Sequence, residues 1–251
     1  MTVGLFHPGE MGAALGAALL AAGHEVLWAS EGRSQATHAR ATLFSDAGTT
    51  AELAERSEVV FSVVPPQAAL ELAESLPPFS GIFVDANAIS PATAARVGSA
   101  VERFVDGGIV GGPPAPRLYL SGAEAGGVAA LFHGSRVDTQ VVANASAVKC
   151  AYAAWTKGSG ALLLAIREFA QAEGIWEPLA EEWARSQPQL ADRLAAAERS
   201  AASKGWRWVA EMEEIAAAFA ADGIPRGFHE AAAAVYRSTS ASAGTRGRPS
   251  T

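Results

Sequence analysis

The sequence predicts an α/β fold, in which a doubly wound, mainly parallel sheet domain is followed by a smaller all-α domain. Three observations support this prediction. Short apolar runs alternate with helical patterns in the first half, a glycine-containing turn joins the first run to the first helical pattern, and the pattern becomes helical and alanine-rich near Asn144. We expect residues 1–143 to form the sheet domain and residues 144–237 the helical domain. The Ser-, Gly-, Arg- and Pro-rich residues 238–251 predict a disordered tail.

The predicted strands are apolar runs such as VVFSVV, which are typical of a parallel sheet covered on both faces. In chain order they are Val3–Phe6, Val26–Ala29, Val59–Val64, Ile82–Asp85, Phe104–Asp106 and Leu118–Ser121, with Arg136–Val142 as a further candidate. Helical patterns lie between them at Met11–Ala22, Gln35–Ala41, Thr50–Arg56, Gln67–Ser75 and Pro91–Val101. The first of these helices is too short to span a bilayer and no basic stretch precedes it, so we expect no membrane partner.

The second domain reads as helices only. One long helix is predicted over Ser146–Glu173, closed by Gly174, and shorter helices over Glu177–Arg185, Gln189–Ser203, Trp206–Ala221 and Gly227–Tyr236.

Composition narrows the classes of function. The chain has 251 residues, of which 49% are hydrophobic, and a formal net charge of −7. An acidic chain without basic runs predicts no nucleic-acid partner, because phosphate backbones are bound by clustered Lys and Arg. The single cysteine, Cys150, predicts no intramolecular disulfide and a reducing, cytoplasmic location. No His/Cys cluster has the spacing of metal ligands, so we expect no metal.

The turn HPGEMG after the first strand predicts a Rossmann-type dinucleotide site. Such a turn directs backbone N–H groups and a helix N-terminus at a pyrophosphate. His7 stands where the first glycine of G-x-G-x-x-G is expected, whereas Gly9 keeps the close approach to phosphate and Gly12 the close helix–strand contact. The expected phosphate-binding residues are Pro8, Gly9, Glu10, Met11 and Gly12. The alternative is a strand–turn–helix unit that binds no nucleotide.

The segment after the second strand bears on the choice between NADP and NAD. An arginine with hydroxyl groups suits a ribose 2′-phosphate, and an acidic residue suits a free 2′-hydroxyl. NADP is favoured by Ser30, Arg33 and Ser34. NAD is favoured by Glu31, unless its side chain points outward. We therefore expect NADP in preference to NAD.

Six segments resemble the 6-phosphogluconate dehydrogenase and β-hydroxyacid dehydrogenase superfamily, and the resemblance covers nearly the whole chain. HPGEMG resembles its G-L-G-x-M-G turn, and Arg33-Ser34 its N-R-T element. SVVPP (Ser62–Pro66) resembles the loop beside the nicotinamide ribose, and DANAISP (Asp85–Pro91) the D-x-S-T-x-x-P segment. DGGIVGGPP (Asp106–Pro114) resembles the substrate loop, and ASAVKCAYAAWTKG (Ala145–Gly158) the helix of the catalytic lysine. WRWVAEMEEI and GIPRGFHEAA resemble a less characterised branch with a phosphogluconate-dehydrogenase-like helical domain.

The resemblance implies an NAD(P)-dependent oxidoreductase that dimerises through its helical domain. It implies that Val64, Pro65, Pro66 and Asn87 lie at the nicotinamide, with Asn87 near the reacting atoms. It places Gly111, Gly112 and Pro113 in the substrate loop, where paired glycine amides suit a carboxylate. The alternative for that loop is a stiff chain reversal with no ligand.

Lys149 is the candidate proton relay. The resemblance puts it at the family's catalytic lysine, and an apolar helix would desolvate the amine and favour its neutral form. The alternative is an interdomain lysine that reaches solvent. Ala153 stands where the family has an asparagine, and Tyr152, on the same helical face as Lys149, is either its replacement or a packing residue. Lys157 would bind an acidic group of the substrate or be solvated.

Together these features predict an NADP-preferring oxidoreductase that transfers hydride between nicotinamide and a small hydroxyacid- or sugar-acid-like substrate. Reduction of a C=N bond on the same fold is the alternative chemistry. A non-catalytic NADP-binding regulatory protein is the alternative class, because His7, Val110 and Ala153 depart from the family pattern.

Overall fold

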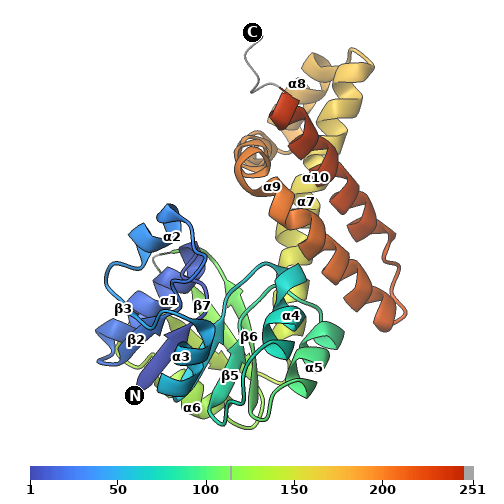
Figure 1. Cartoon of the computed structure of the whole chain (residues 1–251). Helices are drawn as coiled ribbons and strands as arrows, with labels where there is room; N and C mark the ends of the chain where they lie inside the picture. Colours follow the sequence, from blue (N-terminus) through green and yellow to red (C-terminus); the bar gives the residue numbers. More distant parts are fainter. Residues whose placement is uncertain (114, 246–251) are drawn as a thin grey trace. The chain divides into compact units, whose positions relative to one another are not determined.

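The computed structural model describes residues 1–113 and 115–245, and the chain divides into two compact units, Met1–Cys150 and Ala151–Thr251 (Figure 1). The division falls inside the long helix α7 (Ala145–Ala172), whereas the sequence placed the domain boundary between residues 143 and 144. The first turn of α7 therefore belongs to the first unit.

The first unit is built on one eight-stranded sheet with the order β3-β2-β1-β4-β5-β6-β7-β8. The strands are β1 (Thr2–Leu5), β2 (Glu25–Trp28), β3 (Ser45–Asp46), β4 (Val59–Ser62), β5 (Ile82–Asp85), β6 (Phe104–Val110), β7 (Arg117–Ser121) and β8 (Asp138–Val141). Strands β1 to β6 run parallel, and β7 turns back antiparallel to β6. The chain reverses its direction of winding between β1 and β4, as in a Rossmann-type sheet, so the carboxyl ends of six strands share one edge.

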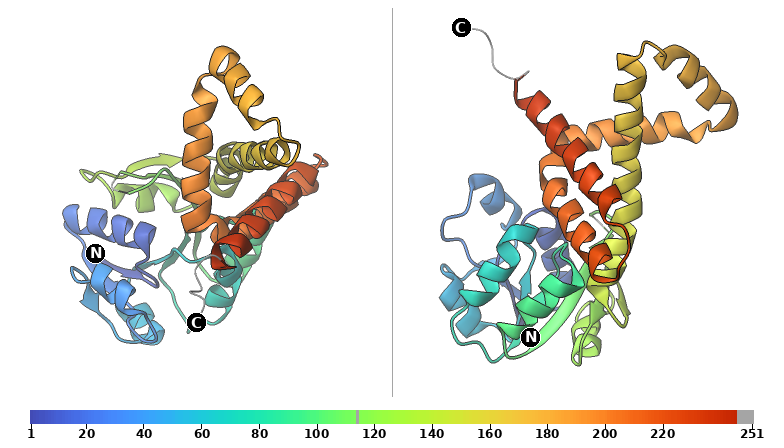
Figure 2. Two further views of the ribbon diagram at one scale, coloured as in Figure 1. Left: turned by 90° about the horizontal axis from the view of Figure 1, so that it is seen from above. Right: turned by 90° about the vertical axis from the view of Figure 1, so that its right-hand side faces the viewer.

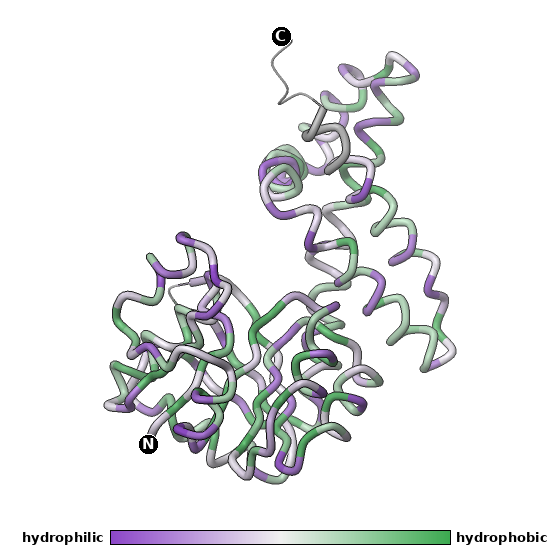
Figure 3. Tube along the Cα trace, viewed as in Figure 1, coloured by the Kyte–Doolittle hydropathy of each residue, from purple (hydrophilic) through white to green (hydrophobic). Residues whose placement is uncertain are grey.

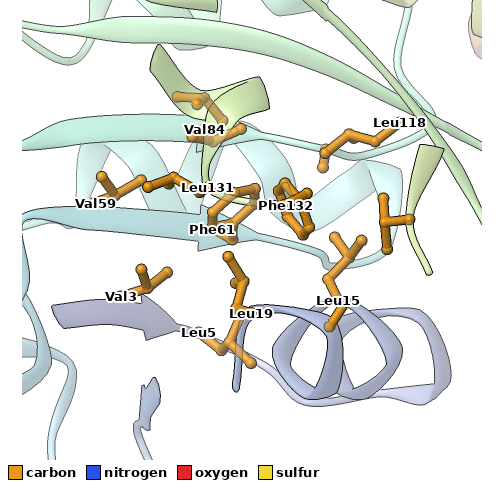
Figure 4. Close-up of a cluster of buried hydrophobic side chains, with 14 of the residues drawn as sticks. Val3, Leu5, Leu15, Leu19, Val59, Phe61, Val84, Leu118, Leu131 and Phe132 are labelled. Atoms are coloured by element: carbon orange, nitrogen blue, oxygen red, sulfur yellow. The ribbon is translucent and has the colours of Figure 1, made fainter. Parts of the chain in front are cut away.

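Helices cover both faces of this sheet. They are α1 (Glu10–Ala21), α2 (Gln35–Arg40), α3 (Thr50–Arg56), α4 (Ala69–Glu74), which follows the 3-10 turn η1 (Pro66–Ala68), α5 (Pro91–Ser99) and α6 (Ala125–Ala130). One core packs strand residues against α1 and α6, and Phe61 meets Phe132 edge-on at 5.8 Å between ring centroids (Figure 4). A second core, with Phe6, Leu53 and Phe83, lies on the opposite face.

The predicted fold class is confirmed, and the differences lie at element ends. β4 stops at Ser62, two residues before its predicted end, because the Val64 N–H bonds to a side chain instead of a strand. β6 continues to Val110, whereas the sequence ended it at Asp106. The short elements β3, η1 and α6 were not predicted.

The second unit contains the rest of α7, followed by α8 (Trp176–Ser186), α9 (Gln189–Ala221) and α10 (Gly227–Thr245). These helices alternate hydrophobic and hydrophilic residues along their length (Figure 3). The prediction of two helices over residues 189–203 and 206–221 was wrong, because α9 is continuous through Gly205. Its axis bends within the helix (Figure 2), as glycine and serine in a helix interior permit.

The end of α10 bears on the predicted tail. Residues 238–245, which the sequence assigned to it, continue this helix, and residues 246–251 lie outside the described residues. Among the described residues, no helix is long and apolar enough to cross a membrane.

Candidate functional site

The turn between β1 and α1 lies at the carboxyl edge of the sheet. Gly9 is the N-cap of α1, and because it has no side chain it makes no side-chain cap hydrogen bond. By contrast, Ser34, Thr49 and Ser90 cap α2, α3 and α5 with their hydroxyl oxygens. The N-cap position of α1 thus lacks the side-chain acceptor that α2, α3 and α5 have there, which suits an anionic ligand.

Two glycines shape this turn in different ways. A β-carbon built on Gly12 would lie 2.5 Å from the carbonyl oxygen of His7, so only glycine lets the helix approach the turn this closely. A β-carbon on Gly9 would meet nothing closer than 3.4 Å. The Gly9 N–H donates to the His7 carbonyl oxygen at 2.8 Å, which closes the turn that the missing first glycine usually makes. Pro8 is buried, Met11 half-buried and Glu10 exposed.

Arg33 joins the carboxyl ends of the first two strands. Its Nη2 donates to the Phe6 carbonyl oxygen at 2.9 Å, and its Nε to the Ala29 carbonyl oxygen at 3.4 Å. Partial burial lowers the pKa of its guanidinium. These bonds use two of the five N–H donors of the side chain.

The other residues of this loop differ in their surroundings. Glu31 is exposed, and Ser34 accepts the Thr37 N–H at 3.3 Å as the cap of α2. Ser30 bonds to the Asp46 carboxylate, which also accepts the Gly48 N–H at 2.7 Å, and these bonds lower the pKa of Asp46, with Gly48 contributing most.

Asn87 ties two loops together at the carboxyl ends of β4 and β5. Its Oδ1 accepts the Val64 N–H at 2.6 Å, and its Nδ2 donates to Ser62 Oγ at 2.9 Å and to Asp85 Oδ2 at 2.7 Å. The side chain is buried and both amide protons are used within the protein. The structure thus places Asn87 as a clamp that fixes the loop of Val64, Pro65 and Pro66, of which Pro65 is exposed.

Asp85 has no exposed surface and receives two hydrogen bonds from Asn87, one from the backbone N–H at 3.0 Å and one from Nδ2. Burial raises the pKa of its carboxyl group to about 7, against the lowering effect of these bonds, and the nearby Asp106 carboxylate adds to the rise. The two acids stand side by side because Asp85 pairs with Asp106 in the register of β5 and β6.

Lys149 lies against β6 at the same edge of the sheet. Its Nζ donates to the Ile109 carbonyl oxygen at 2.9 Å, and its side chain is partly buried. Gly108 makes this contact possible, because a β-carbon there would lie 2.7 Å from the Ala145 carbonyl oxygen and 3.0 Å from Lys149 Cβ. The sequence predicted that this strand ends at Asp106, but Gly107 and Gly108 lie within β6.

Asp106 and two serines hold the first turn of α7. The Ser146 N–H and the Ser121 hydroxyl donate to Asp106 Oδ2 at 2.8 and 3.0 Å, and the Ser146 hydroxyl donates to Oδ1. The Ala145 N–H donates to Ser121 Oγ at 3.0 Å. The sequence reading gave these residues no role. Its one available signal was the repeated ending of IFVD and RFVD, which places an acid at the end of two adjacent apolar strands.

The predicted substrate loop connects β6 to β7. Gly111 has a φ of +90°, which favours glycine, and Gly111, Gly112 and Pro113 are all exposed. Pro114 lies outside the described residues.

Tyr152 and Lys157 belong to the helical unit. Tyr152 is 41% exposed. The ammonium group of Lys157 forms an ion pair with Glu211, in which both side chains are largely buried, and lies 5.5 Å from the ring centroid of Trp208. Tyr236 donates its hydroxyl proton to the Lys157 carbonyl oxygen at 2.6 Å, and burial raises the pKa of Tyr236. The charge that the sequence assigned to an acidic substrate group is thus engaged by Glu211.

Among the described residues, no group of His, Cys, Asp and Glu side chains could hold a metal ion.

Two family models match parts of the chain. Residues 2–91 match a family described as NADP oxidoreductase, coenzyme F420-dependent, and residues 170–239 match a domain of unknown function, DUF1932. A search of curated proteins returned no match.

Solved structures match the chain along its length. The conserved protein MTH1747, of unknown function and described as similar to 3-hydroxyacid dehydrogenases, is 26% identical, with a TM-score of 0.69 over 99% of this chain and 100% of that chain. The description of MTH1747 agrees with the resemblance to the β-hydroxyacid dehydrogenase superfamily. The 3-hydroxyisobutyrate dehydrogenase of Salmonella typhimurium, 17% identical, has the same fold, with a TM-score of 0.68 over 98% of this chain and 99% of that chain. The reductive aminase of Aspergillus terreus, also 17% identical, has a TM-score of 0.57 over 98% and 94%. The resemblance found in the sequence is therefore confirmed at the level of the superfamily, and the oxidoreductase fold with it.

Proposed function

We propose that the protein is an NADP-preferring oxidoreductase that transfers hydride between nicotinamide and a small hydroxyacid- or sugar-acid-like substrate. One observation carries this proposal. The uncapped start of α1, the Arg33 guanidinium and the Lys149 ammonium all lie at the carboxyl edge of the same parallel sheet. In open α/β sheets, this is the edge at which ligands bind.

The residues present fit a dinucleotide. Gly12 allows the close turn, Gly9 leaves room at the helix start, and Arg33 is held with N–H donors remaining for a 2′-phosphate. Ser30 and Ser34 supply hydroxyls beside it, and exposed Glu31 is compatible with an outward position. On the nicotinamide side, the clamp by Asn87 would hold the loop of Val64 to Pro66 in one shape.

Lys149 is the residue we propose to move the proton. A bound nicotinamide supplies or accepts the hydride. During reduction of a carbonyl, the Lys149 ammonium would give its proton to the substrate oxygen as that oxygen gains negative charge, and during oxidation the neutral amine would take the proton back. The bond to the Ile109 carbonyl oxygen orients Nζ at the carboxyl edge of the sheet. The Gly111–Pro113 loop and Tyr152 remain proposed contributors to substrate binding.

Reduction of a C=N bond is the second candidate. It is favoured by Ala153, which is buried and offers no hydrogen-bonding side chain where the superfamily has an asparagine. The likeness to the fold of a reductive aminase agrees with it.

A substrate panel tests the proposal. Purified protein would be mixed with NADPH or NADH and with keto acids, ketones plus amines, and a deazaflavin of the F420 type, and absorbance at the nicotinamide band would be followed. We expect NADPH-dependent turnover with at least one keto or imine compound. Lys149→Met should lower this turnover by at least about a hundredfold, and Lys204→Met, at an exposed lysine of α9, should leave it unchanged. Tight NADPH binding by fluorescence without turnover across the panel would indicate the regulatory class instead.

We also propose a homodimer that forms through the helical unit. Trp155, Leu162 and Phe169 recur every seven residues on α7 and are each more than 60% exposed. A row of large apolar side chains with this spacing suits a partner helix. The proposed location remains the cytoplasm, on the single buried thiol of Cys150.

A further inference from the structure

The buried carboxylate of Asp106 makes its hydrogen bonds with the start of the helix that carries Lys149. It accepts the Ser146 N–H at 2.8 Å and the Ser146 hydroxyl, and it accepts the Ser121 hydroxyl at 3.0 Å. Ser121 in turn accepts the Ala145 N–H at 3.0 Å. Asp106 thus reaches two successive N–H groups of the first turn, one directly and one through Ser121.

The third N–H group of this turn is capped separately. Asn144 Oδ1 accepts the Ala147 N–H at 2.8 Å. Asn144 is exposed, whereas Ser146 is fully buried and Asp106 is 9% exposed. A buried carboxylate at a helix N-terminus also interacts favourably with the helix dipole. Of the two capping groups, Asp106 is therefore the one that anchors the helix to the sheet, because it projects from β6.

Lys149 follows on the next turn of the helix and returns to the same strand. Its Nζ donates to the carbonyl oxygen of Ile109, three residues beyond Asp106 on β6. Gly108, between them, brings the helix backbone to the strand. The backbone at the start of α7 and the ammonium of Lys149 are thus fixed to two points on one strand, and a slide or rotation of the helix would move both.

We infer that Asp106 is the positioning residue for Lys149. Its carboxylate fixes the height and rotation of the first turn of α7 and so the place of the ammonium at the sheet edge. Asp85, its neighbour in register, is bonded to Asn87 and so orders the opposite loop. The catalytic consequence rests on the proposed function, in which Lys149 moves the proton.

The kinetic test compares Asp106→Asn, Asp106→Ala and Ser146→Ala with Asp138→Asn, the same change at an exposed position of β8. Asparagine keeps one acceptor oxygen and removes the charge, whereas alanine removes every acceptor. We expect kcat to fall on the order of tenfold in Asp106→Asn and a hundredfold in Asp106→Ala, as for a displaced catalytic group. KM and the NADPH dissociation constant should change less than threefold, and Asp138→Asn should match the wild type.

A second measurement needs no turnover. The chain has three lysines, Lys149, Lys157 and Lys204, so lysine labelled with ¹³C at Cε gives three signals, assigned with single Lys→Met variants. Asp106→Asn should shift or broaden the Lys149 signal and leave the other two in place. Ser146→Ala, which keeps the backbone bond to Asp106, should shift it less and serves if the Asp106 variants do not fold.

The outcomes separate the two proposals. An unmoved Lys149 signal, or NADPH affinity that falls in parallel with kcat, would overturn the positioning role and leave the proposed function standing. If Lys149→Met keeps full turnover, the proposed proton transfer by Lys149 fails, and the shift of the Lys149 signal still decides whether Asp106 positions the side chain.

Discussion

Replacing Arg33 by Ala should separate NADPH from NADH. The guanidinium is anchored to the Phe6 and Ala29 carbonyl oxygens, so it is already ordered at the edge where the ribose of a dinucleotide would lie. An ordered donor loses little entropy on binding a phosphate, and a hydrogen bond to a charged group contributes about 1.5–3 kcal/mol. Removing it should therefore raise the NADPH dissociation constant roughly 12- to 150-fold.

The same substitution should lower the stability of the free protein by less than it weakens NADPH binding. Of the two anchoring bonds, the one to Phe6 at 2.9 Å is well formed and the one to Ala29 at 3.4 Å is long, so we count about one net hydrogen bond. Its removal should lower the free energy of unfolding by about 0.5–1.5 kcal/mol. This corresponds to a fall in Tm of a few degrees, about 1–6 °C for a chain of this size.

Fluorescence titration with NADPH and NADH measures the two dissociation constants, and differential scanning calorimetry measures the change in Tm. The dissociation constant for NADH should change less than threefold. Arg40→Ala, at an exposed arginine in the last turn of α2, is the matched control and should leave both cofactors unaffected. If NADPH and NADH weaken together by the same factor, Arg33 acts by holding the β1 turn, and Glu31 becomes the candidate reader of the ribose.

Three further predictions follow from the described contacts. Lys149→Met should lower turnover by a factor on the order of 10² to 10⁴ with NADPH affinity unchanged, since the phosphates are held elsewhere; stopped-flow hydride transfer measures it, and unimpaired turnover would remove the assignment. Burial raises the pKa of Asp85 in the folded protein to about 7, from 3.8. Between these two pH values the folded protein binds more protons at this group than the unfolded chain does. The free energy of unfolding should therefore fall as the pH rises from 3.8 to about 7, by at most about 1.4 kcal/mol per pH unit. Urea unfolding at pH 5 and pH 7.5 should show a shallower decline in Asp85→Asn than in the wild type, whereas parallel curves would contradict the raised pKa. Leu162→Glu should give a monomer by light scattering at micromolar concentration and Leu43→Glu, at an exposed leucine of the sheet unit, should not; a wild-type monomer would refute the proposed dimer.

Local patterns were sufficient for most of the sheet unit. Apolar runs located six of the eight strands, because strands covered on both faces contain few polar residues, and the polar strand β8 fell within a further candidate segment. The two-residue strand β3, Ser45–Asp46, is polar and exposed, so no apolar pattern could reveal it. The helix α6 has the sequence AGGVAA, in which paired glycines hide the helical pattern.

Glycine was the commonest source of error, because its role depends on what packs against it. The pair Gly107-Gly108 of β6 was assigned to the segment that resembles the substrate loop. In the fold, β-carbons at these positions would lie 2.7 Å from the carbonyl oxygens of Asp85 and Ala145. The glycines are thus required by close neighbours on other elements, which no local pattern contains. Gly205 lies between the two helices predicted over residues 189–203 and 206–221, but it is buried inside the continuous helix α9.

The candidate site divides in the same way. The turn after β1, Arg33 and Lys149 could be named from the sequence, because they belong to short motifs, and their roles stay predictions. The clamp by Asn87 and the anchoring by Asp106 were not, because each joins residues more than 20 positions apart. Lys157 was assigned to the substrate on its charge alone, and its ion pair with Glu211 depends on the packing of α7 against α9.

The two carboxylates at the ends of β5 and β6 are costly for stability, which supports a role beyond holding the sheet together. An ionised group in a buried position loses its hydration and is tolerated only when hydrogen bonds replace that hydration. Asp106 receives three such bonds, whereas Asp85 receives two and still has its pKa raised to about 7. A well-packed apolar pair in the same register would give a more stable sheet. An apolar pair, however, could neither hold Asn87 against the Val64 loop nor fix the first turn of α7. Asp85 and Asp106 thus lie where the order of the Val64 loop and of the first turn of α7 depends on them. Local departures from the most stable choice of residue are expected at functional sites.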